Sequence, residues 1–418
     1  MKIYLGELGG RTYYLSLEPY ENNNTLIVGQ AGTGKTLFMK SILYRMVEQG
    51  FNENILILDF TGEYDGLPGF KTLYPGLNFY INPLQLPFPM NRDTLFYFIR
   101  YVFGREVTPM QFYVLSEMIG KCKNIRDIIS SLRDEISRAR DDGWRNAYSS
   151  IYNRLMPLGE MDAISKITEI PDGYIHLNLS HMGDQQQTFF SIIILHYLYY
   201  LAKYGEYSAV IVIDEAERIA LPLPGENRID RNIVTKIVDE LRKYGLFIFL
   251  ISHTLHRMDD EIRNNVRNLF VFRLQNPRDV EYASKILFTK PLIIQTLPKF
   301  TAMHRDPYKT YIAERLDIEI EPRIVRKFIP QKPFDFNQIF EKTRKKLLQK
   351  TIDKDEIELL KDPQLRQIYE FYRNRTINIP KDPRYFKEIN GKIVLTNIAE
   401  KICRKIEKEI QNIIKYSQ

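Results

Sequence analysis

The sequence predicts an α/β protein with a mostly parallel sheet, a helical insertion and a small, mainly helical C-terminal segment. Short runs rich in Ile, Val and Leu, such as NILILDF and AVIVIDE, alternate with segments of helical pattern. Such runs are typical of parallel strands that are buried on both faces. A block with apolar residues three and four positions apart interrupts them, and a charged segment follows them.

These changes in pattern divide the 418 residues into three regions. Residues 1–86 and 171–329 are predicted to form one α/β core, because an insertion can leave a sheet at a strand end. Residues 87–170 would form the helical insertion. Residues 330–418 would form a basic, mainly helical region, in which INGKIVLTNIAEKICRKIEKEI would suit the hairpin and helix of a winged-helix module.

Eight apolar runs are predicted to be the strands of the core. Gly, Asn or charged residues bound most of them, as is usual at strand ends. The runs are TLIVG (25–29), NILILDF (54–60), FYINPL (79–84), YIHLNL (174–179), AVIVIDE (209–215), LFIFLIS (246–252), NLFVFRL (268–274) and KTYIA (309–313).

Composition excludes several classes of protein. The run FFSIIILHYLYYLA (189–202) is shorter than the ~20 residues of a membrane-spanning helix, so it is predicted to be a buried helix. The N-terminus lacks the pattern of a secretory signal. Cys122 and Cys403 support neither a disulfide framework nor a metal site. We therefore expect a reducing, cytoplasmic location, and docking to a membrane complex stays open.

The net charge of +7 resides in the C-terminal region. Residues 331–418 contain 20 Lys+Arg and 13 Asp+Glu, so the first 330 residues contain 39 of each sign. A neutral body with a basic segment fits a partner with a phosphate backbone. A solvated helical surface would carry the same excess, so both interpretations stay open.

The stretch TLIVGQAGTGKTLFMK (25–40) contains the pattern G-x-x-x-x-G-K-[ST] between an apolar strand and a helix. Its glycines allow the backbone N–H groups to point at phosphate oxygens, and the helix adds its positive end. Lys35 would reach the β- and γ-phosphates, and the Thr36 hydroxyl would bind Mg²⁺. The predicted nucleotide-binding residues are Gly29, Gln30, Ala31, Gly32, Thr33, Gly34, Lys35, Thr36 and Leu37.

Acidic residues follow two other predicted strands. Asp214 and Glu215 come directly after AVIVI, where ligands of open α/β sheets bind. Asp214 would hold the Mg²⁺ shell, and Glu215 would polarise the attacking water. Glu63, four residues after Asp59, competes with Glu215 for the role of catalytic base if its strand neighbours the phosphate-loop strand. Because carboxylates are suited to both metal binding and proton transfer, this set predicts a hydrolase.

The run LFIFLIS is predicted to lie beside the Asp214 strand, so that its C-terminal end also opens onto the nucleotide. Ser252, His253 and Thr254 would then sense the γ-phosphate. Arg242 and Lys243 precede the same strand and lie too far from this nucleotide, but they could reach one bound by a neighbouring subunit. Basic residues at a helix C-terminus have the same spacing, so a purely structural role stays open.

The order of these motifs resembles that of the HerA/FtsK superfamily of DNA-pumping ATPases, over roughly residues 3–313. The similarity is greatest to HerA-like proteins and to the ATPases of conjugation and type IV secretion. The motifs most specific to this superfamily are Asp-x-x-Gly-Glu-Tyr (59–64) and Arg-Lys-Tyr-Gly (242–245), whereas the phosphate loop is shared by many families. The resemblance implies a RecA-like P-loop fold, a hexameric ring with ATP at the subunit boundaries, and DNA in the centre. It also implies Arg242 as the arginine finger in trans, with Arg267 or Arg273 as alternatives.

The chain departs from the family pattern in two places. His253 stands where the family usually has Gln, and its charge would vary near neutral pH. HerA proteins usually begin with a β-barrel, whereas here the phosphate loop follows the first 28 residues. This weighs against a HerA–nuclease pair and leaves DNA transport, or a virus- or plasmid-borne motor, more open. A nuclease or membrane-channel partner also stays open. The pair His253 and His256 has no third ligand nearby in the sequence to suggest a metal site.

Three function classes follow from these motifs. The first is an ATP-hydrolysing, helicase-like translocase on double-stranded DNA. The second is a type IV secretion, pilus or conjugation ATPase that works with a membrane partner. The third is a nucleotide switch, for which the guanine motif Asn-Lys-x-Asp is missing, since NPRD at Asn276 has Pro in place of Lys. The basic C-terminal region favours DNA over a protein cargo.

Overall fold

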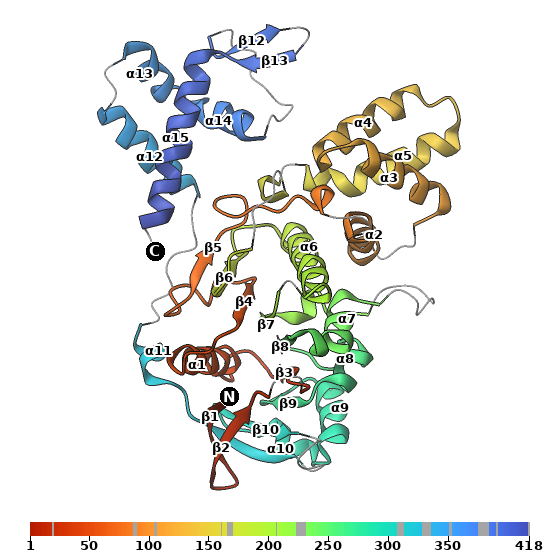
Figure 1. Cartoon of the computed structure of the whole chain (residues 1–418), viewed down its shortest axis with the longest axis vertical. Coiled ribbons are helices and arrows are strands. Elements are labelled where there is room, and N and C mark those ends of the chain that lie inside the picture. Colours follow the sequence, from red (N-terminus) through yellow and green to blue (C-terminus); the bar gives the residue numbers. More distant parts are fainter. Residues whose placement is uncertain are drawn as a thin grey trace.

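A computed structural model of the chain (Figure 1) describes residues 1–18, 21–86, 90–103, 107–159, 161–164, 170–205, 207–222, 231–306, 313–327, 336–350, 353–374, 384–389 and 392–416. An 11-stranded sheet runs through it in the order β2-β1-β11-β10-β9-β3-β8-β7-β4-β6-β5. The strands are β1 (Lys2–Leu8), β2 (Arg11–Ser16), β3 (Thr25–Val28), β4 (Asn54–Asp59), β5 (Lys71–Leu73), β6 (Tyr174–Asn178), β7 (Ala209–Ile213), β8 (Leu246–Ser252), β9 (Asn268–Val271), β10 (Thr301–Arg305) and β11 (Glu314–Ile318).

The seven strands from β9 to β5 in this order pair in parallel. Their residues point alternately to two cores: in β3, Leu26 and Val28 join one cluster and Ile27 joins the other. The same alternation holds in β4 and β7. Both faces are therefore buried, which explains why these strands read as continuous apolar runs. The predicted mostly parallel α/β sheet is confirmed.

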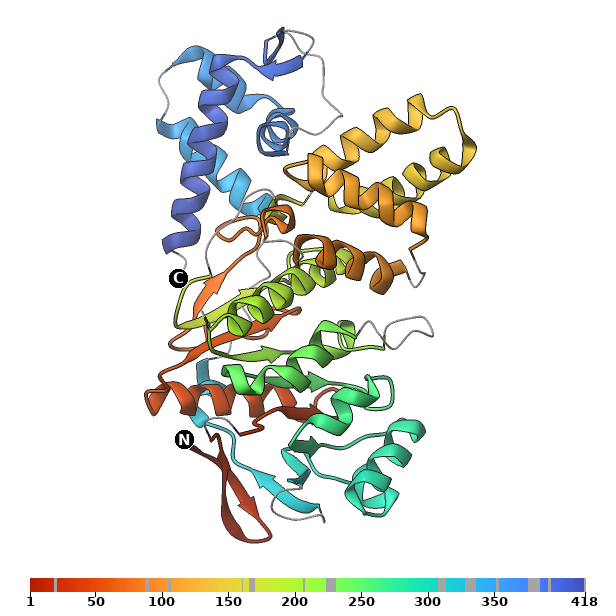
Figure 2. The same cartoon turned by 45° about the vertical axis from the view of Figure 1, so that its right-hand side comes forward.

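Helices cover the two faces unequally (Figure 2). Helix α1 (Lys35–Glu48) covers one face, with α11 (Pro322–Lys327) beside it. The other face is covered by α6 (Asp184–Lys203), α7 (Ile233–Glu240), α8 (Asp260–Asn265) and α9 (Pro277–Leu287), and the short α10 (Pro291–Gln295) packs on α9. Helix α6 contains the apolar run 189–202 and is largely buried, as predicted. Among the described residues, no helix is long and apolar enough to cross a membrane.

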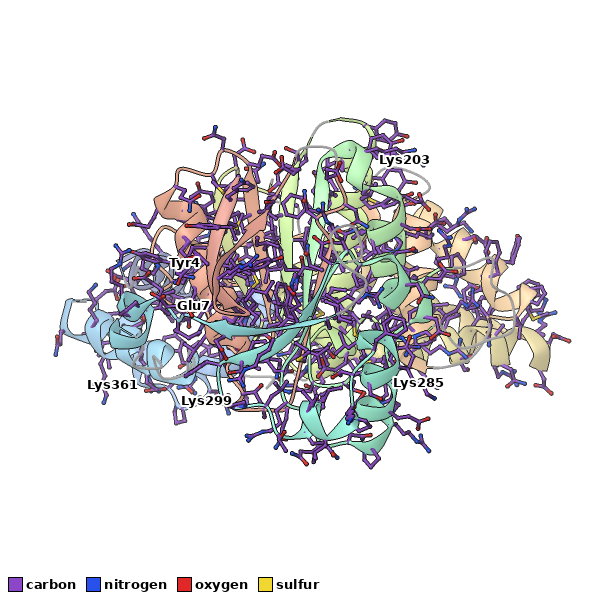
Figure 3. All side chains as sticks on the ribbon, turned by 90° about the horizontal axis from the view of Figure 1, so that it is seen from below. Tyr4, Glu7, Lys203, Lys285, Lys299 and Lys361 are labelled. Carbon is purple, nitrogen blue, oxygen red and sulfur yellow. The ribbon has the colours of Figure 1, made fainter. Side chains whose placement is uncertain are left out.

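Four strands at one edge pair antiparallel, and most of this edge was not predicted. β10, β11, β1 and β2 follow one another from β9 outward. Their sequences mix charged and apolar residues, because much of this edge faces solvent: in β1, Glu7 is exposed and Tyr4 is half-buried, and both are labelled in Figure 3. A half-exposed strand lacks the continuous apolar run by which the inner strands were recognised.

One of the eight predicted strands needs correction, and another lies almost wholly outside the described residues. The run FYINPL is not a strand: Phe79 makes one isolated bridge with Pro75, and Pro83–Gln85 forms a short 3₁₀ helix (η1). Pro83 starts that helix, and the Asn82 side chain caps it by accepting from the N–H of Leu84. The run KTYIA lies outside the described residues except for Ala313, which directly precedes β11.

Four helices lie between β5 and β6. They are α2 (Met90–Phe103), α3 (Pro109–Lys121), α4 (Ile125–Arg138) and α5 (Asp142–Leu155), with short 3₁₀ turns η2 (Met156–Leu158) and η3 (Asp162–Ile164) after them. Their starts follow local rules: Thr108 and Gln111 form a capping box ahead of α3, and Asn124 and Asp141 cap α4 and α5. In Figure 1 this group of helices projects from the sheet beyond α6.

The C-terminal part has its own apolar core. Helices α12 (Phe336–Lys350), α13 (Lys354–Lys361), α14 (Leu365–Asn374) and α15 (Asn397–Tyr416) contribute to it, and Cys403 and Leu77 belong to it. β12 (Phe386–Ile389) and β13 (Lys392–Leu395) form a hairpin that leads into α15, as expected from this stretch of sequence. The domain boundaries and the winged-helix assignment stay predictions. Cys122 and Cys403 are both free thiols.

Candidate nucleotide site

The predicted site residues follow three strands that are direct neighbours. β8 lies between β3 and β7, and all three run in parallel. The phosphate loop follows β3, His253 follows β8, and Asp214 follows β7. Because the carboxyl ends of parallel strands meet at one edge of the sheet, these groups converge there. The prediction that the strand LFIFLIS lies beside the Asp214 strand is therefore confirmed.

The phosphate loop needs glycine at two positions of close contact. A Cβ on Gly29 would lie 2.5 Å from the Cβ of Phe272. A Cβ on Gly34 would lie 2.4 Å from the ring of Phe300, and the φ of Gly34 is +110°. Two backbone bonds fix the start of the loop: the N–H of Gly29 donates to Ser252 O, and that of Gln30 donates to Arg273 O. The loop is therefore held by the two strands next to β3.

Helix α1 begins at Lys35 without a side chain to cap its first turn. Its first N–H groups, on Lys35, Thr36 and Leu37, have no carbonyl one turn earlier to accept from them. Free amides and the positive end of the helix dipole suit phosphate oxygens. The remaining loop residues, Ala31 and Gly32, are exposed, and the Thr33 hydroxyl donates to Gln30 O at 2.7 Å. This part of the chain fits the phosphates of a nucleotide.

The Lys35 ammonium lies buried inside the loop. It donates to Gly29 O at 2.6 Å and to Gln30 O at 3.2 Å, and its Nζ lies 3.1 Å from His253 Nδ1. Burial lowers the pKa of Lys35 to about 8, against the opposing influence of Asp214 and Glu217. Lys35 therefore contacts carbonyl oxygens and an imidazole nitrogen, and a charged phosphate would be a stronger partner.

Asp214 and Thr36 lie together, as the expected metal site requires. The Thr36 hydroxyl donates to Asp214 Oδ2 at 3.2 Å, and the N–H of Glu215 donates to Oδ1. Burial, followed by the charge of Asp59, raises the pKa of Asp214 to about 6. A hydroxyl and a carboxylate are oxygen ligands that Mg²⁺ prefers, and a divalent cation would relieve the buried negative charge. The donor set fits Mg²⁺.

Glu215 adopts an uncommon backbone conformation and has a partner. Its φ is +53°, in the left-handed region that few residues other than glycine adopt. Its Oε2 accepts from Arg218 Nε at 2.5 Å, across the short 3₁₀ helix η4 (Ala216–Arg218). Glu215 thus lies next to the nucleotide edge of the sheet, but its carboxylate is engaged by a guanidinium.

Glu217 is a site residue that the sequence analysis missed. Its charge is the second-largest carboxylate influence on Lys35, after Asp214 and ahead of Glu63 and Glu215. Both of its carboxylate oxygens lie 3.4 Å from the N–H of His253. The spacing Asp214-x-x-Glu217 could have indicated this role, since the two residues flank the turn after β7, but Glu217 is not adjacent to the strand.

The Asp59–Tyr64 motif has a structural explanation. Asp59 is buried, and its carboxylate accepts from the N–H groups of Thr61, Gly62 and Tyr64 at 2.8–3.0 Å. His176 Nε2 lies 2.9 Å from Oδ2, the oxygen that also accepts from Tyr64. Burial alone would raise the pKa of Asp59, but His176 and the amides lower it overall. Asp59 therefore folds the loop that carries Glu63.

Glu63 reaches the site although its strand is not next to β3. β4 pairs with β6 and β7, so β7 and β8 separate it from the phosphate-loop strand. Glu63 was expected to compete as the base only if its strand were next to the phosphate-loop strand, and it is not. Its charge nevertheless acts on Lys35, and it is the largest carboxylate influence on Lys40, whose pKa burial lowers to about 8. Glu63 remains the second candidate for the base.

Of the three predicted sensor residues, only His253 faces the phosphate loop. The Ser252 hydroxyl donates to Thr254 O at 2.7 Å, and the Thr254 hydroxyl donates to Asp279. Asp279, at the start of α9, also pairs with His256 Nδ1 at 2.8 Å. The two histidines therefore face different partners. Among the described residues no group of three His, Cys, Asp or Glu side chains could hold a metal ion.

The candidate arginine fingers occupy different edges of the sheet. Arg242 begins the 3₁₀ turn η5 (Arg242–Tyr244) ahead of β8, and nothing is described of its side chain. β8 has seven residues, which span ~23 Å, so Arg242 lies far from the nucleotide edge of its own subunit. The Arg267 side chain is nearly buried and pairs with Asp306 at 3.3 Å.

Arg273 differs from the other two arginines, because it follows β9 at the nucleotide edge. Its carbonyl accepts from the phosphate-loop amide of Gln30 at 2.9 Å. This position places Arg273 next to the nucleotide site of its own subunit. Arg242 and Arg267, which both precede their strands, lie at the opposite edge.

Comparison with known proteins supports the fold and the resemblance. Residues 3–193 match the family model described as "Helicase HerA, central domain", which confirms the resemblance to P-loop ATPases of the HerA/FtsK type. VirB4 of Thermoanaerobacter pseudethanolicus has a TM-score of 0.61 at 16% identity, over 77% of this chain and 98% of that chain. None of the curated proteins matches the sequence.

The plasmid coupling protein TrwB is similar in two nucleotide-bound structures. In complex with ADP and Mg²⁺ it has a TM-score of 0.56 at 13% identity, over 78% of this chain and 90% of that chain. In complex with the ATP analogue ADPNP it has a TM-score of 0.52 at 13% identity, over 80% and 97%. At these identities the similarity establishes the fold, which is that of the P-loop ATPases.

Proposed function

We propose that this chain is an ATP-hydrolysing motor that forms a hexameric ring and moves on or transports double-stranded DNA. The observation that carries the proposal is the meeting of the phosphate loop, Asp214 and His253 at the ends of three adjacent parallel strands. These groups supply a phosphate cradle, a metal ligand and a group that can contact the third phosphate. A protein that only stores nucleotide needs no such third group.

Nucleotide binding would replace the internal contacts of Lys35. In the structure its ammonium bonds to the carbonyls of Gly29 and Gln30. The β- and γ-phosphates would offer it charged oxygens, while the free amides at the start of α1 take further phosphate oxygens. Thr36 and Asp214 would hold Mg²⁺, which supplies charge neutralisation on the phosphates when it is bound.

Glu215 is our first choice for the base that takes a proton from the attacking water. It directly follows Asp214, and its side chain is about one-fifth exposed, so water can reach it. Hydrolysis then yields ADP and inorganic phosphate, and the proton passes to the carboxylate. His253 would donate a hydrogen bond to a γ-phosphate oxygen, since its ring already contacts Lys35.

DNA binding is proposed for the C-terminal region. One face of α15 forms a groove of about 420 Å³ lined by Asn397, Glu400, Lys401, Arg404, Lys405 and Lys408. Lys401 and Lys405 share the buried carboxylate of Glu356, but the four basic side chains of this face outnumber the carboxylates of Glu356 and Glu400. The lysines labelled in Figure 3, by contrast, lie apart from one another on several elements. A concentrated basic face suits a phosphate backbone.

The second candidate is a secretion or conjugation ATPase that works at a membrane channel. The similarity in fold to VirB4 and to the plasmid coupling protein TrwB favours this alternative. Such a role needs a partner protein in the membrane, and we propose a cytoplasmic location in either case.

The deciding experiment is steady-state ATP hydrolysis with and without long double-stranded DNA at low salt, with Glu215→Gln as the blank. Several-fold stimulation by DNA supports the motor. ATP hydrolysis that does not respond to DNA supports the second candidate. No hydrolysis above the blank at any DNA concentration contradicts both. Mass measurement of the particle with nucleotide tests the hexamer.

A further inference from the structure

The carboxylate of Glu215 is held on the side of β7 that is away from the phosphate loop. Arg218 Nε donates to its Oε2 at 2.5 Å. The other partners of Arg218 are Asp184 and Gln187 at the start of α6, and its guanidinium lies 5.3 Å from the ring centre of Phe60 after β4. In the sheet order, β4 and β6 lie on one side of β7, whereas β8 and β3 lie on the other.

The left-handed backbone of Glu215 also indicates that its carboxylate is held in this position. Its φ and ψ are +53° and +45°, a conformation that is costly for a residue with a side chain. The bond to Arg218 closes a tight turn over three residues, which favours this conformation. The carboxylate thus faces Arg218 and the start of α6.

We propose that Arg218 is a positioning residue that holds Glu215 in a resting conformation, and that hydrolysis requires Glu215 to leave Arg218. The inference rests on the proposed ATPase function. A carboxylate oxygen that accepts a charge-assisted bond from a guanidinium is not free to take a proton from water. Release of Glu215 frees that oxygen and lets the side chain turn toward the phosphate loop.

Arg218 can give up Glu215 at small cost, because it keeps other partners. Its Nη1 donates to Asp184 Oδ1 at 3.1 Å and to Gln187 Oε1 at 2.9 Å. The guanidinium would therefore not be left without an acceptor when Glu215 departs. Arg218 is about one-third exposed, so the pair with Glu215 is of the modest strength that a switch needs.

The turn that carries Arg218 is tied to the helical insertion. The hydroxyl of Tyr101, on α2, donates to the carbonyl oxygen of Arg218 at 2.8 Å and accepts from the N–H of Leu221 at 3.4 Å. A shift of α2 would therefore move the backbone of Arg218 directly. This contact offers a route by which a partner on the helical insertion could release Glu215.

The test compares Arg218→Ala with wild type in ATP hydrolysis without DNA. Removal of the pair should raise kcat about two- to fivefold, the factor expected for a partly exposed ion pair. KM and the affinity for ADP should stay within twofold, because Arg218 does not touch the phosphate loop. Arg231→Ala is the matched control: its side chain is 34% exposed against 33% for Arg218, and it pairs with Asp239 and Glu261 instead. This control should leave kcat unchanged.

An unchanged or lower kcat in Arg218→Ala overturns the inference, whereas absence of hydrolysis in wild type contradicts the proposed function itself. Arg218→Lys provides a second measurement if the alanine variant does not fold. Lysine keeps the charge but cannot span Glu215, Asp184 and Gln187 together. It should also raise kcat, and a value at or below wild type would overturn the inference.

Discussion

The ammonium of Lys35 and the ring of His253 contact each other across neighbouring strands, with 3.1 Å between Nζ and Nδ1. A charged ammonium can only donate, so Nδ1 is the acceptor in this contact. His253 therefore lies where a γ-phosphate that attracts Lys35 would also meet the ring. In the proteins that this sequence resembles, Gln usually stands at this position, and an imidazole has a similar reach.

This contact predicts a specific defect in His253→Ala. The value of kcat should fall about 100-fold, as for the loss of one donor to a charged transition state, because the ring would no longer contact the phosphate. The affinity for ADP should change less than twofold, since ADP has no γ-phosphate. His253→Gln is the matched variant and should keep at least a tenth of the activity. Equal loss in both variants would contradict the sensor role.

Lys35→Met should abolish nucleotide binding and should alter the pH dependence of stability. The pKa of the buried Lys35 is lowered to about 8, from about 10.5 in the unfolded chain, so the folded protein disfavours the charged form. Below pH 8 both states carry the proton and the full penalty of about 3 kcal/mol applies. Between pH 8 and 10.5 the folded state loses the proton first, and the penalty is relieved.

The free energy of unfolding of wild type should therefore rise relative to that of Lys35→Met as the pH increases from 7.5 to 10. Urea unfolding at both pH values measures this difference without nucleotide. With ATP and Mg²⁺ bound, the free energy of unfolding of wild type should no longer rise between pH 7.5 and 10, because the phosphates stabilise the charged ammonium. A difference that is flat with pH would show that Lys35 is not a buried charge in the free protein.

Asp59→Asn should destabilise the fold rather than act on catalysis alone. The buried carboxylate accepts from three backbone amides and pairs with His176, whereas an amide presents an N–H₂ group to one set of these donors. We expect a loss of about 2–4 kcal/mol in thermal or urea unfolding at pH 7. Because the pKa of Asp59 is lowered, its contribution is present above the ordinary carboxyl pKa and is lost in more acidic solution.

Asp65→Asn is the control for Asp59. Asp65 lies 3.5 Å from the same His176 ring but is partly exposed, and its carboxylate accepts from the Tyr74 hydroxyl only at 3.4 Å. Its variant should lose less than about 1 kcal/mol. Similar losses in the two variants would show that the hydrogen bonds from the backbone amides to Asp59 contribute little to stability.

The contrast between Asp59 and Asp214 shows what the sequence could predict. Asp214 and the phosphate loop follow from local patterns, because a strand, its end and the polar residue after it are contiguous. The partner of Asp59 is His176, 117 residues away on β6, and no local pattern indicates it. The same holds for Arg218, whose contact with Asp184 joins the turn after β7 to the start of α6. Exposed edge strands were missed because their alternation is irregular.

Glu215→Gln and Glu63→Gln separate the two candidate bases. Glu215→Gln should bind ATP with unchanged affinity and lose hydrolysis by at least 100-fold, because an amide cannot accept the proton from water. Glu63→Gln should keep more than a tenth of wild-type hydrolysis, because its strand is separated from β3 by two others. Binding by nucleotide fluorescence and single-turnover hydrolysis measure the two effects. Reversed results would assign the base to Glu63.

Arg242→Ala should be inactive alone and should be rescued by Lys35→Ala subunits in mixed rings. Arg242 precedes β8, while the proposed nucleotide site lies at the other end of that ~23 Å strand, so a finger role would have to serve a neighbouring subunit. In an equimolar mixture about a quarter of the sites would combine an intact phosphate loop with an intact neighbouring arginine. Hydrolysis should therefore recover to about a quarter of wild type.

Lys243→Ala is the control for this mixture, since it removes a charge from the same turn. Its hydrolysis alone should stay within about threefold of wild type, because its ammonium lies 5.0 Å from the ring centre of Tyr244 and lacks the planar fork by which an arginine contacts phosphate. Gel filtration must show mixed particles of ring size before the mixture is assayed. Background activity in such verified mixed rings would contradict the finger in trans, because each ring would contain sites with both groups present. Arg242 would then act only on the turn between α7 and β8.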